Sequence, residues 1–466
     1  MSCPDNFRPH RLSRRHFVGA AVAAGGLVIA PRIVRAAQGN DWLHAEDLST
    51  LPDTTIRYWF FESPERTALG EEQVEEFQNL HPNITVEGRT APEAVDNEQL
   101  LAFIRAGTNS HVHQTVNNED PWYIRHDLLQ PLDELPGFQE VWDRLAPQAN
   151  YTWRDGHVYS LSWYTDPMAM FYNRQLVVDA GLDPENPPVT YSEYREWAAA
   201  LTKDTNGDGQ PDQWFISLPI GEEWWNYEFV HYPFYIAATG SNQLIDTEGK
   251  TAIFNSPAAL QSYELVNELY RNGYSAEGPF DVDPFLSGIV ASTLEGAWML
   301  KTAQTSAPEG FEYIVGPLPK PDDAPHEGNP SFLFVRSLNL MREQQKEGEE
   351  AAATDRAAWE FLKFLLTPEQ MAADFAAAGD FPAAADLLTN PLYTETMDSL
   401  GPQARWLADY GQQGFIYDMN TPYEAEAMAI LQETWSTMAL GTATPQDALA
   451  EAERRVNELL ANPPAD

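Results

Sequence analysis

The sequence predicts an α/β protein with two lobes, and three observations support this fold class. The chain has 466 residues, which is more than one hydrophobic core usually organises. Apolar spacing over residues 56–86 follows a strand, helix, strand order, which indicates a βαβ unit. Residues 155–182 contain one strand, a polar interruption and a second apolar run. Such a stretch is expected where a chain crosses between lobes and lines a cleft.

The first 36 residues predict a twin-arginine signal peptide. Arg14 and Arg15 directly precede an apolar run over residues 17–30, which is too short to span a bilayer. Small residues at 34 and 36 are typical of a cleavage site, so we expect a mature chain that begins near Ala37. The twin-arginine export machinery is then a partner, and the location is the periplasm. The only cysteine, Cys3, lies in this segment, so neither a disulfide, a thiol nucleophile nor a lipid-anchoring cysteine is expected afterwards.

Charge excludes several partners. The chain has 28 Lys and Arg against 70 Asp and Glu, a formal net charge of −42. Such a balance repels nucleic acid and anionic membranes. We interpret this negative charge as a solvated acidic surface suited to a saline environment. This interpretation concerns the habitat of the protein and does not concern its ligand.

Apolar periodicity and helix-capping residues predict the following strands and helices, in chain order. Strands are expected at 56–61, 84–86 and 112–116, with helices at 71–80 and 100–105. The loop 117–122 follows a strand end, which is where ligands sit in open α/β sheets. Strands at 158–163 and 168–172 flank the polar segment 164–167. Later helices are expected at 190–201, 257–271, 354–377 and 444–460, and strands at 314–315 and 333–340, with a proline-rich irregular crossover over 317–330.

Nine segments in order resemble the extracellular solute-binding proteins of family 1, the carbohydrate-binding components of ABC importers related to maltose-binding protein. They are FQNLHPNITV, LLAFIRAGTNSHV, LLQPLDEL, DGHVYSLSWYTDPMAMFYNRQLVVDAGL, PPVTYSEYREWAAALT, LEGAWMLK, VGPLPKP, AAWEFLKFLLTPEQ and GDFPAA. The resemblance implies the two-lobed type II periplasmic binding protein fold, with mainly parallel sheets flanked by helices and hinged closure. It divides the chain into residues 42–163 plus 325–380, and 168–320 plus 382–466.

The resemblance also implies ligand contacts. Asp166 matches an acidic position that hydrogen-bonds sugar hydroxyls, and Trp298 in the Glu295–Trp298 motif matches an aromatic that stacks on a sugar ring. The complete set of candidate ligand-binding residues is Glu119, Asp120, Trp122, Trp163, Tyr164, Asp166, Trp224, Trp225, Glu295 and Trp298. Aromatic faces and carboxylates suit sugars because C–H faces stack while hydroxyls need hydrogen-bond partners. For several of these aromatics the alternative is a place in the core, as expected for Trp197 and Trp359.

Residues 204–212, DTNGDGQPD, resemble the front of a calcium loop. Asp204, Asn206, Asp208 and Asp212 supply oxygens at the required spacing, but the closing position is Phe215 instead of glutamate. Calcium is one interpretation and a polar turn with two left-handed glycines is the other. No other cofactor is expected.

The function expected from these residues is capture of a sugar or oligosaccharide in the periplasm and its delivery to ABC permease subunits, by a monomer and without catalysis. Two alternatives stay open. Paired carboxylates could serve a secreted carbohydrate-active hydrolase, and a cleft lined by Glu119, Asp120, Asp166 and aromatics could hold a polyamine or another cationic solute.

Overall fold

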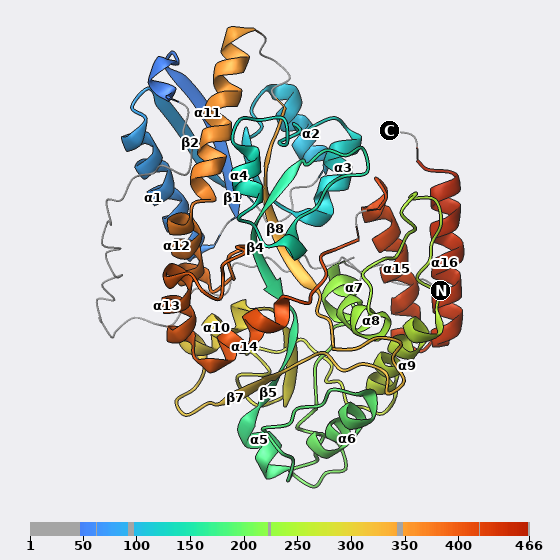
Figure 1. Cartoon of the computed structure of the whole chain (residues 1–466). Helices are drawn as coiled ribbons and strands as arrows, with labels where there is room; N and C mark the ends of the chain where they lie inside the picture. The colour runs from blue at the N-terminus through green and yellow to red at the C-terminus, as the bar shows by residue number, and fades with distance from the viewer. Residues whose placement is uncertain are drawn as a thin grey trace, which may run out of the picture. The chain divides into compact units, whose positions relative to one another are not determined.

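In the computed structural model, five strands form the first sheet in the order β2-β1-β3-β8-β4 (Figure 1). Strand β1 is parallel to both β2 and β3, whereas β8 is antiparallel to β3 and β4. The strands are β1 (Thr54–Phe61), β2 (Ile84–Ala91), β3 (Val112–Val116), β4 (Ser160–Pro167) and β8 (Leu333–Leu340). Every position of β3 and β8 is buried, including the polar side chains of His113, Gln114, Arg336 and Asn339, so these strands hold polar groups inside the protein.

The second sheet has three strands in the order β6-β5-β7, namely β6 (Ser292–Glu295), β5 (Ala169–Asn173) and β7 (Tyr313–Gly316). The expectation of mainly parallel sheets is wrong here, because β5 is antiparallel to both neighbours. Only Met168 separates the end of β4 in the first sheet from the start of β5 in the second sheet. The first residue of β5, Ala169, pairs with Glu295, the last residue of β6. The strands β6 and β7 therefore end where β5 begins, and their loops face the junction between the sheets.

The segment predicted to interrupt a strand is instead part of one. Strand β4 continues through Pro167, which pairs with Leu333, after an irregularity between Ser162 and Tyr164. Proline is tolerated there because it is the last residue of the strand, where one ladder donor fewer matters little. Two further segments run beside this crossing: the Thr165 backbone N–H donates to Phe381 O at 2.8 Å, and the Leu333 N–H donates to Phe415 O at 2.7 Å.

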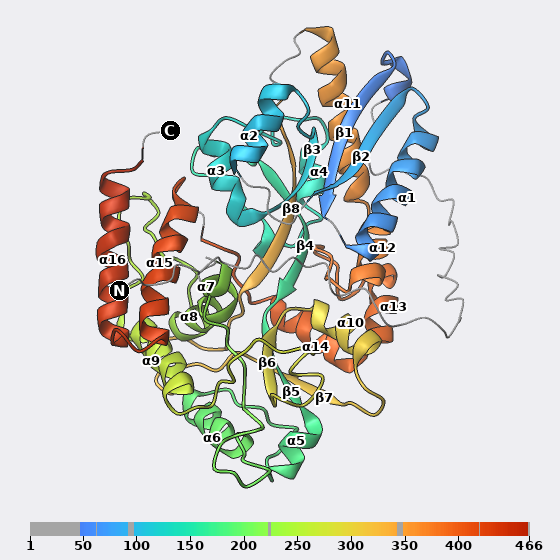
Figure 2. The ribbon, with the colours of Figure 1, turned by 180° about the vertical axis from the view of Figure 1, so that it is seen from behind.

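Helices pack against both sheets. Helices α1, α11 and α12 lie together against the first sheet, and α9, α15 and α16 pack side by side (Figures 1 and 2). The helices of the first half are α1 (Pro64–Leu80), α2 (Asn97–Ala106), α3 (Asp120–Arg125), α4 (Phe138–Trp142), α5 (Arg174–Asp179), α6 (Tyr191–Leu201), α7 (Trp225–Val230) and α8 (Tyr232–Thr239). Those of the second half are α9 (Pro257–Arg271), α10 (Trp298–Ser306), α11 (Glu349–Leu365), α12 (Pro368–Ala378), α13 (Pro391–Leu400), α14 (Pro402–Gly411), α15 (Glu424–Ala439) and α16 (Pro445–Ala461). Short 3₁₀ helices occur at η1 (Leu48–Thr50), η2 (Asn117–Glu119) and η3 (Pro147–Ala149).

Two helix boundaries differ from the sequence expectation, for reasons of capping. Helix α1 begins at Pro64, before the predicted residue 71, because the Ser63 side chain accepts a hydrogen bond from the Arg66 N–H. The helix predicted over 354–377 is two helices, since Thr367 caps α12 and Pro368 cannot continue α11. The capping box at Thr190 and Glu193 is confirmed. Trp197 and Trp359 are buried, as expected for core residues.

The structure describes residues 47–61, 63–91, 97–221, 225–342, 348–418 and 420–464. The predicted signal peptide and Trp224 lie outside these residues, and the side chain of Trp225 is not described. The described residues belong to one compact unit. The residue boundaries expected for the two lobes stay a prediction. Among the described helices, none has the length and apolar content needed to cross a membrane.

Candidate functional site

The segment after β3, expected as a loop over 117–122, is instead the 3₁₀ helix η2 followed directly by α3, and it carries acidic and amide side chains into the interior. Asp120 is 4% exposed, and its carboxylate accepts hydrogen bonds from Ser160 Oγ at 2.5 Å, Thr115 Oγ1 at 3.3 Å and Asn339 Nδ2 at 3.4 Å. Burial nevertheless raises the pKa of Asp120 to about 7. These three donors come from β4, β3 and β8, so the first sheet itself positions this carboxyl group.

Glu119, next to Asp120, is a second carboxyl with a perturbed pKa. Desolvation raises the pKa of Glu119 to about 8, and the neighbouring Asp120 adds to the rise, while a hydrogen bond from the Val116 N–H and the charge of Arg336 oppose it. Titratable groups with such shifts cluster at functional sites. The segment chosen from its position after a strand therefore has the electrostatics of a site.

Asp166, on β4, is fully buried among charged groups. Neither of its carboxylate oxygens has a hydrogen-bond partner. Burial raises its pKa to about 8, against the charge of Arg66, the Phe381 backbone N–H and the charge of Arg336, which lower it. Arg66 forms ion pairs with Asp380 and, at 3.8 Å, with Asp374, so this guanidinium is already matched by two acids.

Arg336 lies among the buried acids of the candidate site, and the sequence reasoning did not single it out. It lies on β8, 6% exposed, with its guanidinium 3.9 Å from the centre of the Phe61 ring and 5.8 Å from that of Tyr164. Its charge acts on Glu119 and on Asp166. A lone arginine inside the apolar run FLFVRSLNL was the signal that could have identified it, because a charge in a buried strand needs partners.

The opposite wall of the site comes from α7, where Glu228 is 1% exposed. Its Oε2 accepts a hydrogen bond from Asn118 Nδ2 at 3.1 Å, and burial raises its pKa to about 8. Glu424, at the start of α15, is also buried, and its pKa is raised well above the ordinary value by desolvation and by Asp418 and Glu228. Sequence reasoning missed both glutamates, since acids are abundant along the chain and neither follows a strand.

Trp298 and Glu295, both candidates from the sequence, contact each other at the end of β6. Trp298 Nε1 donates to Glu295 Oε2 at 2.8 Å, and burial raises the pKa of Glu295 to about 7. The Trp298 ring contacts Phe229 of α7 and Phe334 of β8 edge to face, with centroids 6.2 Å and 6.1 Å away. This half-buried indole thus lies where the second sheet, α7 and the first sheet meet.

Three predicted aromatics lie in packed surroundings. Trp163 and Tyr164 are each 2% exposed, and the Arg66 guanidinium lies 5.1 Å from the centre of the Tyr164 ring. Trp122 is half-buried and packs on His126, with centroids 4.1 Å apart. Each has neighbours that account for its position, and ligand contact by these three side chains stays a prediction.

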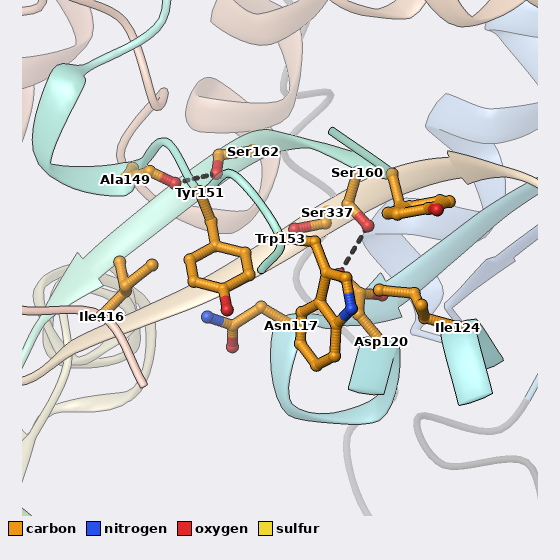
Figure 3. A pocket seen from close by; sticks show the side chains of 11 residues that line it. Asn117, Asp120, Ile124, Ala149, Tyr151, Trp153, Ser160, Ser162, Ser337 and Ile416 are labelled. Carbon is orange, nitrogen blue, oxygen red and sulfur yellow. Dashed lines mark hydrogen bonds between the residues drawn. The ribbon is translucent and has the colours of Figure 1, made fainter. Parts of the chain in front are cut away.

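A narrow pocket lies beside Asp120, with a volume of about 20 Å³, which is room for a group of about the size of one water molecule. Figure 3 shows the rings of Tyr151 and Trp153 and the amide of Asn117 gathered beside β4 and β8, with the hydrogen bond between Ser160 and Asp120 drawn. Ile416, from the segment before α15, also lines the pocket. Asn117 is 3% exposed, yet neither its amide nitrogen nor its oxygen has a hydrogen-bond partner. The pocket therefore contains a buried polar group that a ligand could satisfy.

The predicted calcium loop forms a self-contained turn. Asp204 accepts hydrogen bonds from the backbone N–H groups of Gly207, Asp208 and Gly209, and Gly207 and Gly209 have positive φ. These contacts are those of the polar-turn interpretation. Within the described residues, no group of three or more His, Cys, Asp or Glu side chains is placed to hold a metal ion. Calcium binding through Asp204, Asn206, Asp208 and Asp212 stays a prediction.

Comparison with known proteins gives a consistent picture. The family model described as bacterial extracellular solute-binding protein matches residues 72–399. The sn-glycerol-3-phosphate-binding periplasmic protein UgpB of Escherichia coli (strain K12) is 26% identical over 374 residues, which are 77% of this chain and 82% of UgpB. UgpB of Shigella flexneri is 25% identical over the same lengths.

Solved structures share the fold. The cyclic α-maltosyl-1,6-maltose binding protein from Arthrobacter globiformis superimposes with a TM-score of 0.73 at 21% identity, over 88% of this chain and all (100%) of that one. The sugar-binding protein MalE from Xanthomonas citri gives 0.71 at 21% identity, over 88% and 98% of the two chains. These similarities confirm the predicted two-lobed α/β fold.

Proposed function

Since this chain belongs to the bacterial extracellular solute-binding protein family, we propose that it is the periplasmic substrate-binding protein of an ABC importer. It captures a sugar or oligosaccharide between its two lobes and delivers it to membrane permease subunits. The relatives named above are binding proteins for sn-glycerol-3-phosphate and for maltose-type sugars, and the polyhydroxylated character of those ligands is what this site suits.

One observation carries the proposal. Buried polar atoms without protein partners lie on both sides of the contact between Asn118 and Glu228: both amide atoms of Asn117, the side-chain oxygen of Asn118 and the second carboxylate oxygen of Glu228. Buried polar groups are ordinarily hydrogen-bonded, because leaving one unsatisfied costs about 1–3 kcal/mol. A ligand with several hydroxyls would satisfy donors and acceptors together, while Trp298 offers a ring face to its C–H surface.

Ligand screening tests this proposal directly. The mature chain, from Ala37, is heated with sugars, oligosaccharides and polyols, and hits are measured by calorimetry. A ligand that binds the folded state alone raises the melting temperature by mass action, and one ligand per chain is expected. Trp298→Ala and Asp166→Ala should abolish the shift while the unliganded melting temperature stays within a few degrees. Trp406→Ala, which removes an indole that is 36% exposed on α14, is the matched control.

The same oligosaccharides distinguish a binding protein from a hydrolase. Incubation of each oligosaccharide with the protein, followed by chromatography, should return the sugar unchanged. Product formation that depends on Asp166 or Glu119 would contradict a receptor and favour the enzyme.

The proposal also covers the export route, the oligomeric state and calcium binding. Twin-arginine translocation would carry the folded chain, with cleavage near Ala36, and substitution of Arg14 and Arg15 by lysine should retain the precursor in the cytoplasm. The mature protein should elute from a sizing column as a monomer, with and without ligand. Release of bound calcium on unfolding would support the metal proposal for Asp204, Asn206, Asp208 and Asp212.

A further inference from the structure

The wall of the site that includes the pocket beside Asp120 is strongly acidic. Asp120, Glu228, Asp418 and Glu424 are each between 1% and 4% exposed. The charges that act most strongly on Glu424 are those of Asp418, Glu228 and Glu426, all of the same sign. Asp418, Glu424 and Asp120 likewise act together on Tyr151, which lines the pocket. Burial of several like charges is costly unless an opposite charge accompanies them.

The two arginines of the site do not supply that opposite charge. Arg66 is matched by Asp374 and Asp380. Arg336 faces Glu119, Asp166 and Glu228, whose pKa values its charge lowers. Acidic groups therefore outnumber basic ones around the junction, and none of the described residues that line the pocket beside Asp120 is a lysine, arginine or histidine. A phosphate ester would find no cation to pair with there, so a ligand such as sn-glycerol-3-phosphate, named for the UgpB relatives, does not suit this pocket.

The second observation is the pocket itself. The Asn117 amide, buried and without a partner, is aimed into a space that also contains the Tyr151 and Trp153 rings and borders Asp120 (Figure 3). An ammonium group is recognised by this combination, because carboxylate and amide oxygens accept its protons while aromatic faces attract its charge. A neutral hydroxyl can donate a hydrogen bond to the same oxygens, but because it has no positive charge it is attracted only weakly to the aromatic faces.

We infer that the ligand captured here is a sugar or polyol bearing a protonated amine, whose ammonium group sits in the pocket between Asp120, Asn117, Tyr151 and Trp153. This inference rests on the proposed function, since it assigns a substrate class to the same site. The hydroxyls of the ligand would then face the unpartnered oxygens of Asp166 and Glu228.

Matched probes test the inference. Glucosamine, N-acetylglucosamine and glucose have the same ring and differ in one substituent, and chitosan oligomers and chito-oligosaccharides repeat the comparison at greater length. Calorimetry should show each amine probe binding at least about tenfold more tightly than its uncharged counterpart, a ratio equal to ~1.4 kcal/mol. sn-Glycerol-3-phosphate should give no measurable heat. Raising ionic strength should weaken the amine probes and leave the neutral ones unchanged, a measurement that needs no variant.

Asp120→Asn should remove the preference for amines by lowering their affinity to that of the neutral probes. Asp409→Asn, which removes the same charge at an exposed position of α14, should retain it. Equal or tighter binding of neutral sugars, or binding of the phosphate ester, would overturn the inference while leaving the receptor function intact. Failure of every sugar, polyol, amine and phosphate probe would overturn both.

Discussion

Asn118 Nδ2 donates a hydrogen bond to Glu228 Oε2 at 3.1 Å, and it thereby joins the segment after β3 to helix α7. The two residues are 110 positions apart in sequence. The first belongs to the end of the five-stranded sheet and the second to the wall beside the three-stranded sheet. This contact is a direct link across the candidate site, and it forms only when the two walls are close together.

Loss of this link should weaken the closed form. Asn118→Ala leaves Glu228 Oε2 without its donor, at a cost of about 1–3 kcal/mol to the closed arrangement. We expect weaker ligand affinity by calorimetry and a larger radius of gyration by small-angle X-ray scattering in the absence of ligand. Asn272→Ala, at the exposed end of α9, is the control. Unchanged affinity in Asn118→Ala would mean that the contact contributes nothing to closure.

A second link joins α3 to α15. Arg125 Nη1 lies 3.1 Å from Glu426 Oε1 and 3.2 Å from Pro422 O, and its guanidinium is 4.7 Å from the centre of the Tyr423 ring. Arg125→Glu should lower ligand affinity because it places like charges together, and the exchange of both residues, Arg125→Glu with Glu426→Arg, should restore part of it. Absence of any recovery in the double variant would assign the effect to Pro422 and Tyr423 instead of the ion pair.

Stability without ligand should depend on pH. Burial raises the pKa values of Glu119, Asp166 and Glu228 to about 8, whereas the same groups in an unfolded chain titrate near about 4. Between those values the folded protein binds more protons than the unfolded chain, so stability falls as pH rises toward 8. The melting temperature should therefore decrease from pH 5.5 to about 8.5.

A single substitution should reduce this slope. Glu119→Gln removes one of the three titrations and should flatten the dependence of melting temperature on pH. Glu264→Gln, at an exposed position of α9, should leave the slope unchanged. A melting temperature that rises steadily over the same range would show that these carboxyl groups are ionised in the folded protein at neutral pH.

Gly296 is expected to control the position of Trp298. A Cβ atom at Gly296 would overlap the Trp298 ring, so Gly296→Ala should displace the indole from Glu295. We expect a shift in tryptophan fluorescence and a loss of ligand affinity, with the two sheets still folded as judged by circular dichroism. Gly181→Ala has no atom within 4 Å of the added carbon, and because Gly181 also has a positive φ, its backbone strain makes it a stringent control. Unchanged ligand affinity in Gly296→Ala would show that the position of Trp298 does not matter for ligand binding.

Much of the fold could be predicted from local pattern. The strand at 112–116, the capped helix at 190–201 and the helix at 257–271 follow from apolar periodicity and from hydroxyl or proline signals at their starts, which act within a few residues. Helices α13, α14 and α15 and strand β6 were not predicted. Helices α13 and α14 pack on each other and α15 packs on α16, and which faces of these helices meet is decided by the tertiary packing.

The sequence by itself determined the α/β class, the order of most elements and several residues around the site, because helix capping and strand periodicity are local and the acids follow a strand end. Only the tertiary structure decided which of these groups meet. Asp166, Arg336 and Glu228 come from β4, β8 and α7, and the sign and size of their pKa shifts depend on burial among one another. Burial and the separation of charged groups depend on packing across the whole chain, so no single stretch of sequence determines them.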